Sequence, residues 1–139
     1  MAGVTGLNHI TLAVGDVERS FEFCTRLLGF EPVALWDKGA YLQAGDVWLA
    51  LVLDREGKLS ARADYSHIAL SSSHEDFEEM VTALEEKGVK AWSQNVSEGA
   101  SWYFLDPDGH KLELHVGDLQ TRLKAMRDNP WSEIHFFAD

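Results

Sequence analysis

The stretch that decides the fold is residues 7–14, LNHITLAV, because residues 65–72, YSHIALSS, repeat its pattern. Each has a histidine, His9 or His67, followed by Ile, a small residue and Leu. Apolar side chains at alternate positions predict a strand with one buried face. The same strand written twice in one short chain indicates an internal repeat.

The segments after each of these strands also match in order. Helices are predicted over residues 16–29, with Asp16 as N-cap and Gly29 at the end, and over residues 74–88. Three strands follow each helix, and they are predicted at residues 31–37, 39–45, 46–53, 89–95, 101–107 and 110–116. The sequence therefore predicts an α+β fold of two βαβββ modules, whose four-stranded sheets surround a shared cleft.

A polar, charged segment separates the two halves. We expect a first module over residues 1–53, a linker over 54–64 and a second module over 65–116. An amphipathic helix and tail are predicted over residues 117–139.

The composition excludes several classes of partner. The 139 residues carry 12 basic and 23 acidic side chains, a formal net charge of −11, which repels a phosphate backbone. No apolar run approaches the ~20 residues that a membrane span needs, and no N-terminal signal pattern is visible. The single cysteine, Cys24, suits a reducing compartment and is expected to be a small buried side chain. We expect a cytoplasmic protein with no nucleic-acid or membrane partner.

Three side chains are candidates for a metal site. His9 and His67 hold equivalent places in the repeat, and a pseudo-twofold relation between the modules would bring them together. Glu113 lies between Leu112 and Leu114 and so faces away from their apolar side. Aligning the modules sets Ala50 against Glu113, which leaves three ligands and open positions for Mn, Fe, Zn or Ni. Taken singly, each residue is equally consistent with a satisfied polar side chain.

A loop over residues 95–104 and the final helix supply further polar groups. Oxygen-bearing and small residues in the loop suit a hard cation, and they are Asn95, Ser97, Glu98, Gly99 and Ser101. Arg122 on the helix could bind an anionic oxygen. From the residues alone, an ordinary hairpin loop and a solvated helix face are the simpler interpretations. The remaining histidines are interpreted as structural, and they are His74, His110, His115 and His135.

The chain resembles the manganese-dependent fosfomycin-resistance glutathione transferases of the vicinal oxygen chelate superfamily. The segments that carry the resemblance are GLNHITLAV, LLGF, WDKGAYL, GDVWLAL, DYSHIAL, QNVSEGAS, YFLDPDGHKLELHVGDL and RLKAMRDNP. It runs nearly end to end, and it implies a glyoxalase-type fold in a homodimer whose modules are swapped between subunits. It also implies Mn²⁺ and K⁺ as cofactors and glutathione as the co-substrate that opens the epoxide of fosfomycin.

The resemblance also implies roles for individual residues. His9, His67 and Glu113 match the metal ligands, and Thr11 matches the hydroxyl that assists thiol attack. Contacts to the phosphonate match Ser97, Tyr103 and Arg122. The potassium loop matches Asn95, Ser97, Glu98, Gly99 and Ser101. The walls of the substrate and thiol cleft match Trp36, Tyr41, Trp48 and Tyr65, and of these Trp36 and Tyr41 are assigned to the thiol.

Two positions depart from the family pattern. Ser93 stands where the family has a phosphonate-binding lysine, and Val96 where it has an arginine at the site entrance. Each lost charge-assisted contact could cost about 1.5–3 kcal/mol. Transferases that use another thiol, and an epoxide hydrolase, are therefore alternatives. A hydrolase would need an additional carboxylate base, and only Asp37 lies near the expected place. Two other classes share the fold: an iron dioxygenase with two histidines and one carboxylate, and a non-catalytic drug-binding protein.

Overall fold

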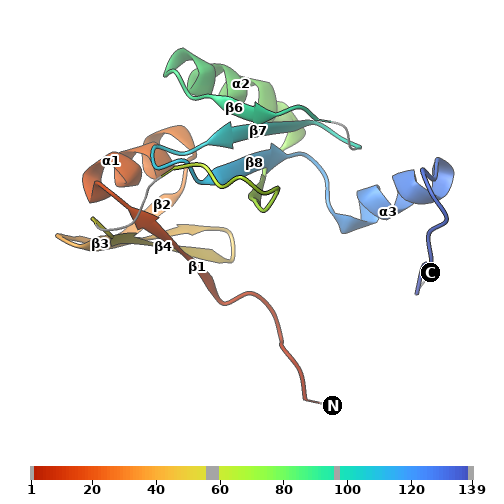
Figure 1. Ribbon diagram of the computed structural model, residues 1–139, viewed down its shortest axis with the longest axis horizontal. Coiled ribbons are helices and arrows are strands. Elements are labelled where there is room, and N and C mark those ends of the chain that lie inside the picture. Colours follow the sequence, from red (N-terminus) through yellow and green to blue (C-terminus); the bar gives the residue numbers. More distant parts are fainter. Residues whose placement is uncertain (1, 56–59, 96–97, 138–139) are drawn as a thin grey trace.

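The computed structural model describes residues 2–55, 60–95 and 98–137. They form two four-stranded sheets, in the orders β1-β4-β3-β2 and β5-β8-β7-β6 (Figure 1). The predicted α+β fold of two βαβββ units is confirmed. The elements are β1 (His9–Val14), α1 (Val17–Glu22), η1 (Phe23–Leu27), β2 (Glu31–Trp36), β3 (Gly39–Ala44), β4 (Val47–Leu53), β5 (Ile68–Ser71), α2 (His74–Glu86), β6 (Ala91–Ser93), β7 (Ser101–Leu105), β8 (Lys111–His115) and α3 (Leu119–Asp128).

The two sheets have the same register. In the first, Ala50 pairs with Thr11 on parallel β1 and with Tyr41 on antiparallel β3. In the second, Glu113 pairs with Ala69 on parallel β5 and with Tyr103 on antiparallel β7. Ala50 and Glu113 are thus equivalent positions, as the alignment of the repeats predicted.

The first helix differs from a plain α-helix in its second half. Asp16 caps it as predicted, because its side chain accepts the Arg19 backbone N–H at 3.0 Å. The last turn, η1, is π-helical, and the Leu28 N–H bonds to the carbonyl of Phe23, five residues back. Gly29 ends the segment with a φ of 77°, the left-handed conformation that glycine adopts most readily.

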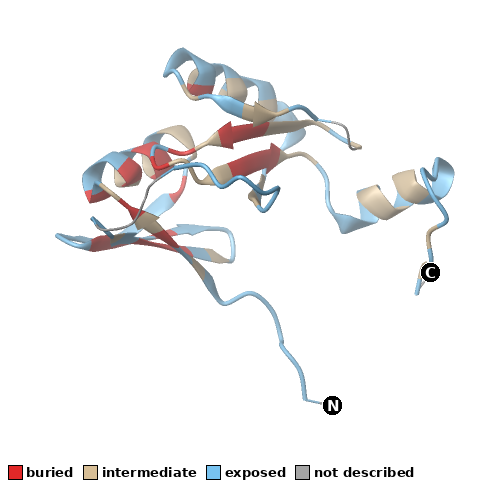
Figure 2. Cartoon of the chain, viewed as in Figure 1, coloured by how far each residue is buried: buried red, intermediate tan, exposed pale blue. Residues whose placement is uncertain are grey.

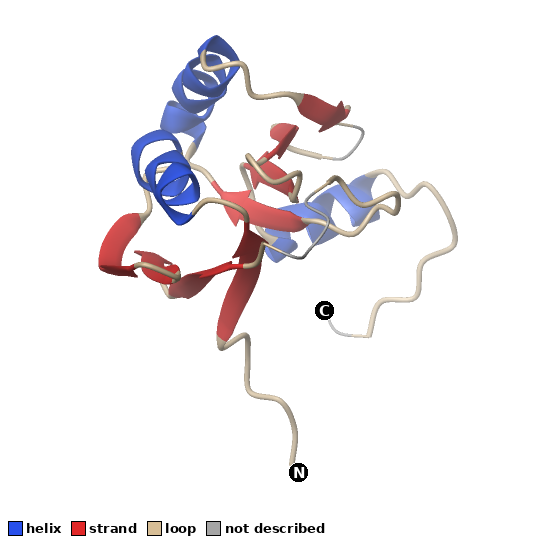
Figure 3. Cartoon of the chain, turned by 60° about the vertical axis from the view of Figure 1, so that its left-hand side comes forward, coloured by secondary structure: helices blue, strands red, loops and turns tan. Residues whose placement is uncertain are grey.

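Apolar faces of the sheets and helices form the core. Its largest fully buried side chains are Phe104, Leu42, Leu51, Leu84 and Leu114. Helices α1 and α2 lie next to each other on one side of the molecule (Figure 3), and η1 contacts α2. Cys24 is buried in this core, which confirms its predicted place, and burial raises the pKa of its thiol to about 12.

Polar contacts fix the two modules to one another. Asp108, on the turn between β7 and β8, accepts hydrogen bonds from the Gly15 N–H at 3.0 Å, the Arg19 guanidinium at 2.6 Å and the Ser20 hydroxyl at 3.1 Å. His110 Nε2 donates to the Ala13 carbonyl oxygen at 2.7 Å. These bonds run between elements of different repeats, so they set the angle between the sheets.

The final helix lies apart from the rest. Helix α3 projects away from both sheets (Figure 1), and none of its residues is buried (Figure 2). Asp118 begins it with a capping box that includes Thr121. None of the helices in the described residues has the length and apolar character that crossing a membrane needs.

Candidate metal and substrate site

Glu113 and His67 meet on the open face of the second sheet. Glu113 lies at the centre of β8 and is 5% exposed. Its Oε1 is 2.9 Å from His67 Nε2. His67 Nδ1 is 2.8 Å from the carbonyl oxygen of Tyr65, which can only accept, so Nδ1 carries a proton that it donates. A protonated ring would donate from Nε2 to the carboxylate, whereas a neutral ring would turn a lone pair to it. A neutral imidazole beside a buried carboxylate is a donor set that fits a divalent metal ion.

Strand β5, which follows His67, starts later than predicted. The first pair of the β5–β8 ladder is Ile68 with Leu112, so His67 precedes the strand instead of lying inside it. Its position is fixed by the bond to Tyr65 and by ring contacts with Trp92 and Tyr103 at centroid distances of 5.3 and 5.7 Å. The imidazole is therefore held in place although its backbone is outside the ladder.

His9 lies on the other sheet. Its ring packs on Trp48 at a centroid distance of 4.3 Å, and its Nδ1 is 2.7 Å from the Asn8 side-chain oxygen. Among the described residues, the one group of three potential ligands within 4.8 Å of one another is Asp106, Asp108 and His110. The expected convergence of His9 with His67 and Glu113 therefore does not occur inside a single chain.

The group of Asp106, Asp108 and His110 serves the module contact. Asp106 Oδ1 accepts the backbone N–H groups of Asp108 and His110 at 2.9 and 2.8 Å, and Asp108 accepts the three bonds described above. Burial raises the pKa of Asp106, and the nearby His110 opposes that rise. Because both carboxylates are engaged in these internal bonds, the cluster is explained as a polar contact between the modules.

Aromatic side chains cover the open face of the first sheet. Trp36 and Tyr41 make an edge-to-face contact at 4.9 Å, and Tyr41 makes another with Trp48 at 5.3 Å. All three rings are partly exposed. Thr11 lies on β1 two residues after His9, so it shares this face. Such a row of exposed rings suits contact with a ligand or with another protein surface.

Tyrosines of the second module lie beside the His67–Glu113 pair. Tyr103 is 3% exposed and stands opposite Glu113 in the ladder, whereas Tyr65 is largely exposed. A hydrogen bond with Tyr103 raises the pKa of Tyr65, and burial adds to that rise. Both phenols therefore border the same site.

The predicted cation loop is partly described. The Asn95 side chain donates to the Gly99 carbonyl at 2.8 Å, and Glu98 accepts from Arg122 Nε at 2.9 Å. Ser101 donates to Glu113 Oε2 at 2.7 Å, so this loop and the metal candidates are contiguous. Ser97 and Val96 lie outside the described residues. Ser93, the other departure from the family pattern, has its hydroxyl 3.5 Å from the Gln94 carbonyl oxygen.

His115 also lies beside this site. It was interpreted as structural from the sequence, and its side chain lies 2.6 Å from Ser101 Oγ and 3.3 Å from Glu98 Oε1. The period of two along β8 places it on the face of Glu113, and that signal was available in the sequence.

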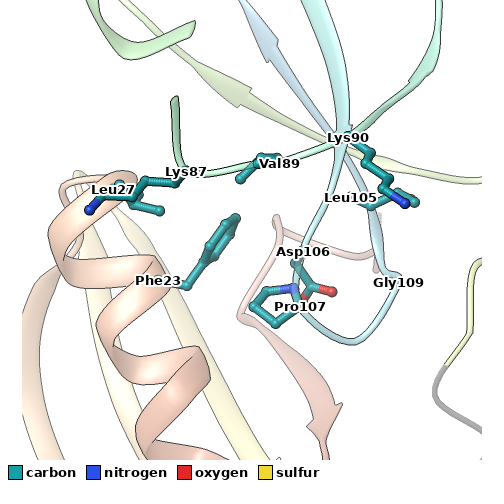
Figure 4. Close-up of a pocket in the computed structure, with 10 residues that line it drawn as sticks. Phe23, Leu27, Lys87, Val89, Lys90, Leu105, Asp106, Pro107 and Gly109 are labelled. Atoms are coloured by element: carbon teal, nitrogen blue, oxygen red, sulfur yellow. The ribbon is translucent and has the colours of Figure 1, made fainter. Parts of the chain in front are cut away.

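A cavity of about 410 Å³ lies between η1 and the turns at residues 87–90 and 106–109 (Figure 4). Its described lining contains none of the predicted site residues.

Comparisons with known proteins identify the family of the chain. Residues 6–114 match the model of the Glyoxalase/Bleomycin resistance protein/Dioxygenase superfamily. The chain is 50% identical over 135 residues to Glutathione transferase FosA of Serratia marcescens, covering 96% of both chains. It is 35% identical over 129 residues to Metallothiol transferase FosB of Staphylococcus epidermidis, covering 90% of this chain and 93% of that one.

A solved structure shows the same fold. It is a mutant of the fosfomycin resistance protein FosX from Listeria monocytogenes, complexed with Mn(II) and 1S,2S-dihydroxypropylphosphonic acid. The TM-score is 0.72 at 29% sequence identity, and the match covers 88% of this chain and 99% of that one. The chain belongs to the Glyoxalase/Bleomycin resistance protein/Dioxygenase superfamily, in the group that contains Glutathione transferase FosA and FosX.

Proposed function

We propose that this protein is a metal-dependent thiol transferase that opens the epoxide of fosfomycin by adding glutathione, and so gives resistance to the antibiotic. One observation carries the proposal: the buried carboxylate of Glu113 lies 2.9 Å from His67 Nε2, so a histidine and a carboxylate are brought together on one sheet face. Half of the residues are identical to those of a glutathione transferase over nearly the whole chain. The same relationship argues against the dioxygenase and drug-binding alternatives.

The proposed site is completed by a second copy of the chain. His9 and its aromatic neighbours lie on a sheet face that is open in one chain, and α3 contributes no buried residue. A homodimer in which the first module of one protomer faces the second module of its partner would bring a His9 to His67 and Glu113. That arrangement would also cover the exposed rings of Trp36 and Trp48.

His9, His67 and Glu113 would hold the metal ion. A divalent ion such as Mn²⁺ in that place supplies a Lewis acid for the epoxide oxygen. Because Ala50 occupies the position equivalent to Glu113, the protein adds no fourth ligand. Substrate oxygens would take the remaining positions.

The reaction forms a bond between the thiol sulfur and an epoxide carbon while the bond from that carbon to oxygen breaks. The thiol proton is lost and the opened oxygen gains one, so the product is a hydroxyl-bearing thioether. Thr11 shares the open face with His9, and its hydroxyl would assist this proton transfer. Trp36, Tyr41, Trp48 and Tyr65 would form the walls that orient the thiol and the substrate.

The anionic end of fosfomycin would be held at the other side of the site. Arg122, Tyr103 and Ser97 are proposed as phosphonate contacts, with the Arg122 guanidinium positioned by Glu98. Potassium is proposed at the loop that includes Asn95, Ser97, Glu98, Gly99 and Ser101, where carbonyl, hydroxyl and carboxylate oxygens gather.

Ser93 and Val96 reduce the positive charge near this end. Without the lysine and arginine of the family pattern, we expect weaker binding of the dianionic substrate. The change also keeps other thiols, such as cysteine or bacillithiol, as alternatives to glutathione.

Epoxide hydration is the second candidate function. The likeness to FosX, which is solved with a dihydroxypropylphosphonic acid, favours it. A hydrolase also needs an additional carboxylate as general base. Near the expected place the chain offers Asp37, which lies at the turn between β2 and β3 and not on a strand, and this argues against hydration. Water would replace the thiol as the nucleophile at the same site.

Mass spectrometry of the products tests the proposal. The protein is stripped of metal, reloaded with Mn²⁺ and K⁺, and given fosfomycin with glutathione, cysteine, bacillithiol or no thiol. A glutathione adduct that requires Mn²⁺ is the expected result. A diol formed without thiol would assign the hydrolase instead, and an unchanged antibiotic in every reaction would refute both functions.

A further inference from the structure

His115 lies beside the proposed metal ligand: its Nδ1 is 3.5 Å from Glu113 Oε2, and Ser101 bridges the two side chains at shorter distances. It follows Glu113 by two residues on β8, so both side chains point to the open face. His115 Nδ1 lies 2.6 Å from Ser101 Oγ, and Ser101 Oγ lies 2.7 Å from Glu113 Oε2. The His115 and Glu113 side chains are 12% and 7% exposed, so water competes little for these bonds.

The direction of these hydrogen bonds follows from the chemistry of the groups. An ionised carboxylate only accepts, so the hydroxyl proton of Ser101 points to Glu113. The oxygen of Ser101 must then accept from His115 Nδ1–H. Glu113 Oε2 therefore accepts from the Ser101 hydroxyl, whereas Oε1 faces His67.

The other nitrogen of His115 reaches the anion-binding end of the site. Nε2 is 3.3 Å from Glu98 Oε1, and the same oxygen accepts from Arg122 Nε at 2.9 Å. His115 is therefore the side chain that lies between Glu98 and Glu113. It connects a residue positioned by α3 with a residue at the centre of β8.

Two glycines show that the place of the ring is built for it. A Cβ on Gly99 would lie 3.3 Å from His115 Cε1 and 2.5 Å from the Val116 carbonyl oxygen. A Cβ on Gly117 would lie 3.2 Å from His115 Nε2. Both glycines have positive φ, 75° and 128°. Both glycines therefore approach the Cε1–Nε2 edge of the imidazole closely, and a side chain at either position would press on the ring.

We propose that His115 is a positioning residue: it holds Ser101 so that the serine hydroxyl fixes the Glu113 carboxylate for metal binding, and it holds Glu98 beside Arg122. This inference rests on the proposed function for its metal site, but it assigns a task to a residue outside the proposed ligand set. Partners that orient metal ligands typically change metal affinity by 10–100-fold when removed.

Mn²⁺ binding, measured by electron paramagnetic resonance without any substrate, tests whether His115 positions Glu113 through Ser101. We expect about a tenfold or greater weakening of Mn²⁺ binding in His115→Ala and in Ser101→Ala. Because His115 acts through Ser101, the double variant should bind Mn²⁺ no more weakly than the weaker single variant. His74→Ala, an exposed histidine at the start of α2, is the matched control and should bind as the parent does.

Two conservative variants of His115 separate its contact with Ser101 from its contact with Glu98. The amide of His115→Asn can replace Nδ1 near Ser101 but is too short to reach Glu98, so it should restore most of the Mn²⁺ affinity. It should still show a raised KM for fosfomycin with a smaller change in kcat, because Glu98, which positions Arg122, loses its contact with His115. The longer amide of His115→Gln should not restore Mn²⁺ affinity.

Unchanged Mn²⁺ binding in His115→Ala would overturn the inference. Additive losses in the double variant, or equal losses in the Ala and Asn variants, would also overturn it, because they indicate a general structural role. A parent protein that binds Mn²⁺ yet modifies no fosfomycin would refute the proposed function alone, since the binding measurement needs no turnover. A parent that binds no Mn²⁺ would refute both.

Discussion

Arg19 and Asp108 join the two modules: the guanidinium donates to the carboxylate across 2.6 Å, and the Asp108 side chain is 1% exposed. The Ser20 hydroxyl and the Gly15 N–H donate to the same carboxylate. Removing it leaves the Ser20 hydroxyl and the Gly15 N–H without their acceptor, whereas the Arg19 side chain is 47% exposed and can turn to water. Each buried donor without an acceptor typically costs about 1–3 kcal/mol.

We therefore expect Asp108→Ala to lower the free energy of unfolding by about 3 kcal/mol, as measured by urea titration. Glu22→Ala is the control, because Glu22 faces Arg26 at 4.0 Å on an exposed helix surface and should cost well under 1 kcal/mol. Similar losses in the two variants would mean that the module contact contributes little to stability.

The proposed dimer with swapped modules predicts how mixtures of inactive variants behave. His9→Ala and Glu113→Ala should each be inactive, since each removes a proposed metal ligand. When the two are refolded together, half of the dimers are mixed, and each mixed dimer has one intact site out of two. Activity should return to about a quarter of that of the parent. Refolded mixtures that stay inactive, although mixed dimers form, would place the ligands within one chain.

Gly99 should tolerate no side chain. Its φ of 75° is close to the 77° of Gly29, but a Cβ on Gly29 would meet nothing within 4 Å, whereas on Gly99 it would meet the Val116 carbonyl oxygen at 2.5 Å. Both alanine variants should lose about 1 kcal/mol to the left-handed backbone. We expect Gly99→Ala alone to lose more stability than this and to weaken Mn²⁺ binding through the displaced His115. Equal stabilities, with metal binding intact in both, would show that the loop adjusts freely.

The buried thiol of Cys24 predicts a loss of stability in alkali. Its pKa is raised from 9.0 to about 12 in the folded protein, so above pH 9 the unfolded chain releases this proton while the folded chain retains it. The unfolded state then binds fewer protons, and the free energy of unfolding falls as pH rises. Between pH 8 and pH 10 the fall should be about 1 kcal/mol.

A comparison with Cys24→Ala isolates this effect, because other groups that titrate in the same range are common to both chains. The difference in unfolding free energy between the parent and the variant should shrink as pH increases. A difference that stays constant to pH 10 would show that the thiol ionises as easily in the folded chain as in the unfolded one.

The period-two alternation along the strands was sufficient to predict the two modules and the shared face of His67 and Glu113. It could not predict where pairing begins. The β5–β8 ladder starts with the pair Ile68–Leu112, so His67 lies just outside it. The His67 imidazole is held by its hydrogen bond to the Tyr65 carbonyl oxygen. The π-helical turn at Phe23–Leu27 also has no local signal, since it depends on how that turn packs against the core.

The role of His115 needed tertiary information. A histidine at a strand end has many uses, and its sequence neighbours do not distinguish them. The β7–β8 ladder brings Ser101 opposite His115, and the loop brings Glu98 to the other side of the ring. Both partners are more than ten residues away along the chain, so periodicity on one strand could not identify them.

The difference between Ala50 and Glu113 makes the two halves of the repeat chemically unequal. In the proposed site, a carboxylate at both positions would give the metal ion four protein ligands, whereas the methyl group of Ala50 offers none. One more coordination position would then be open to an oxygen of the substrate. A single departure from internal symmetry would thus decide how much of the coordination sphere belongs to the protein.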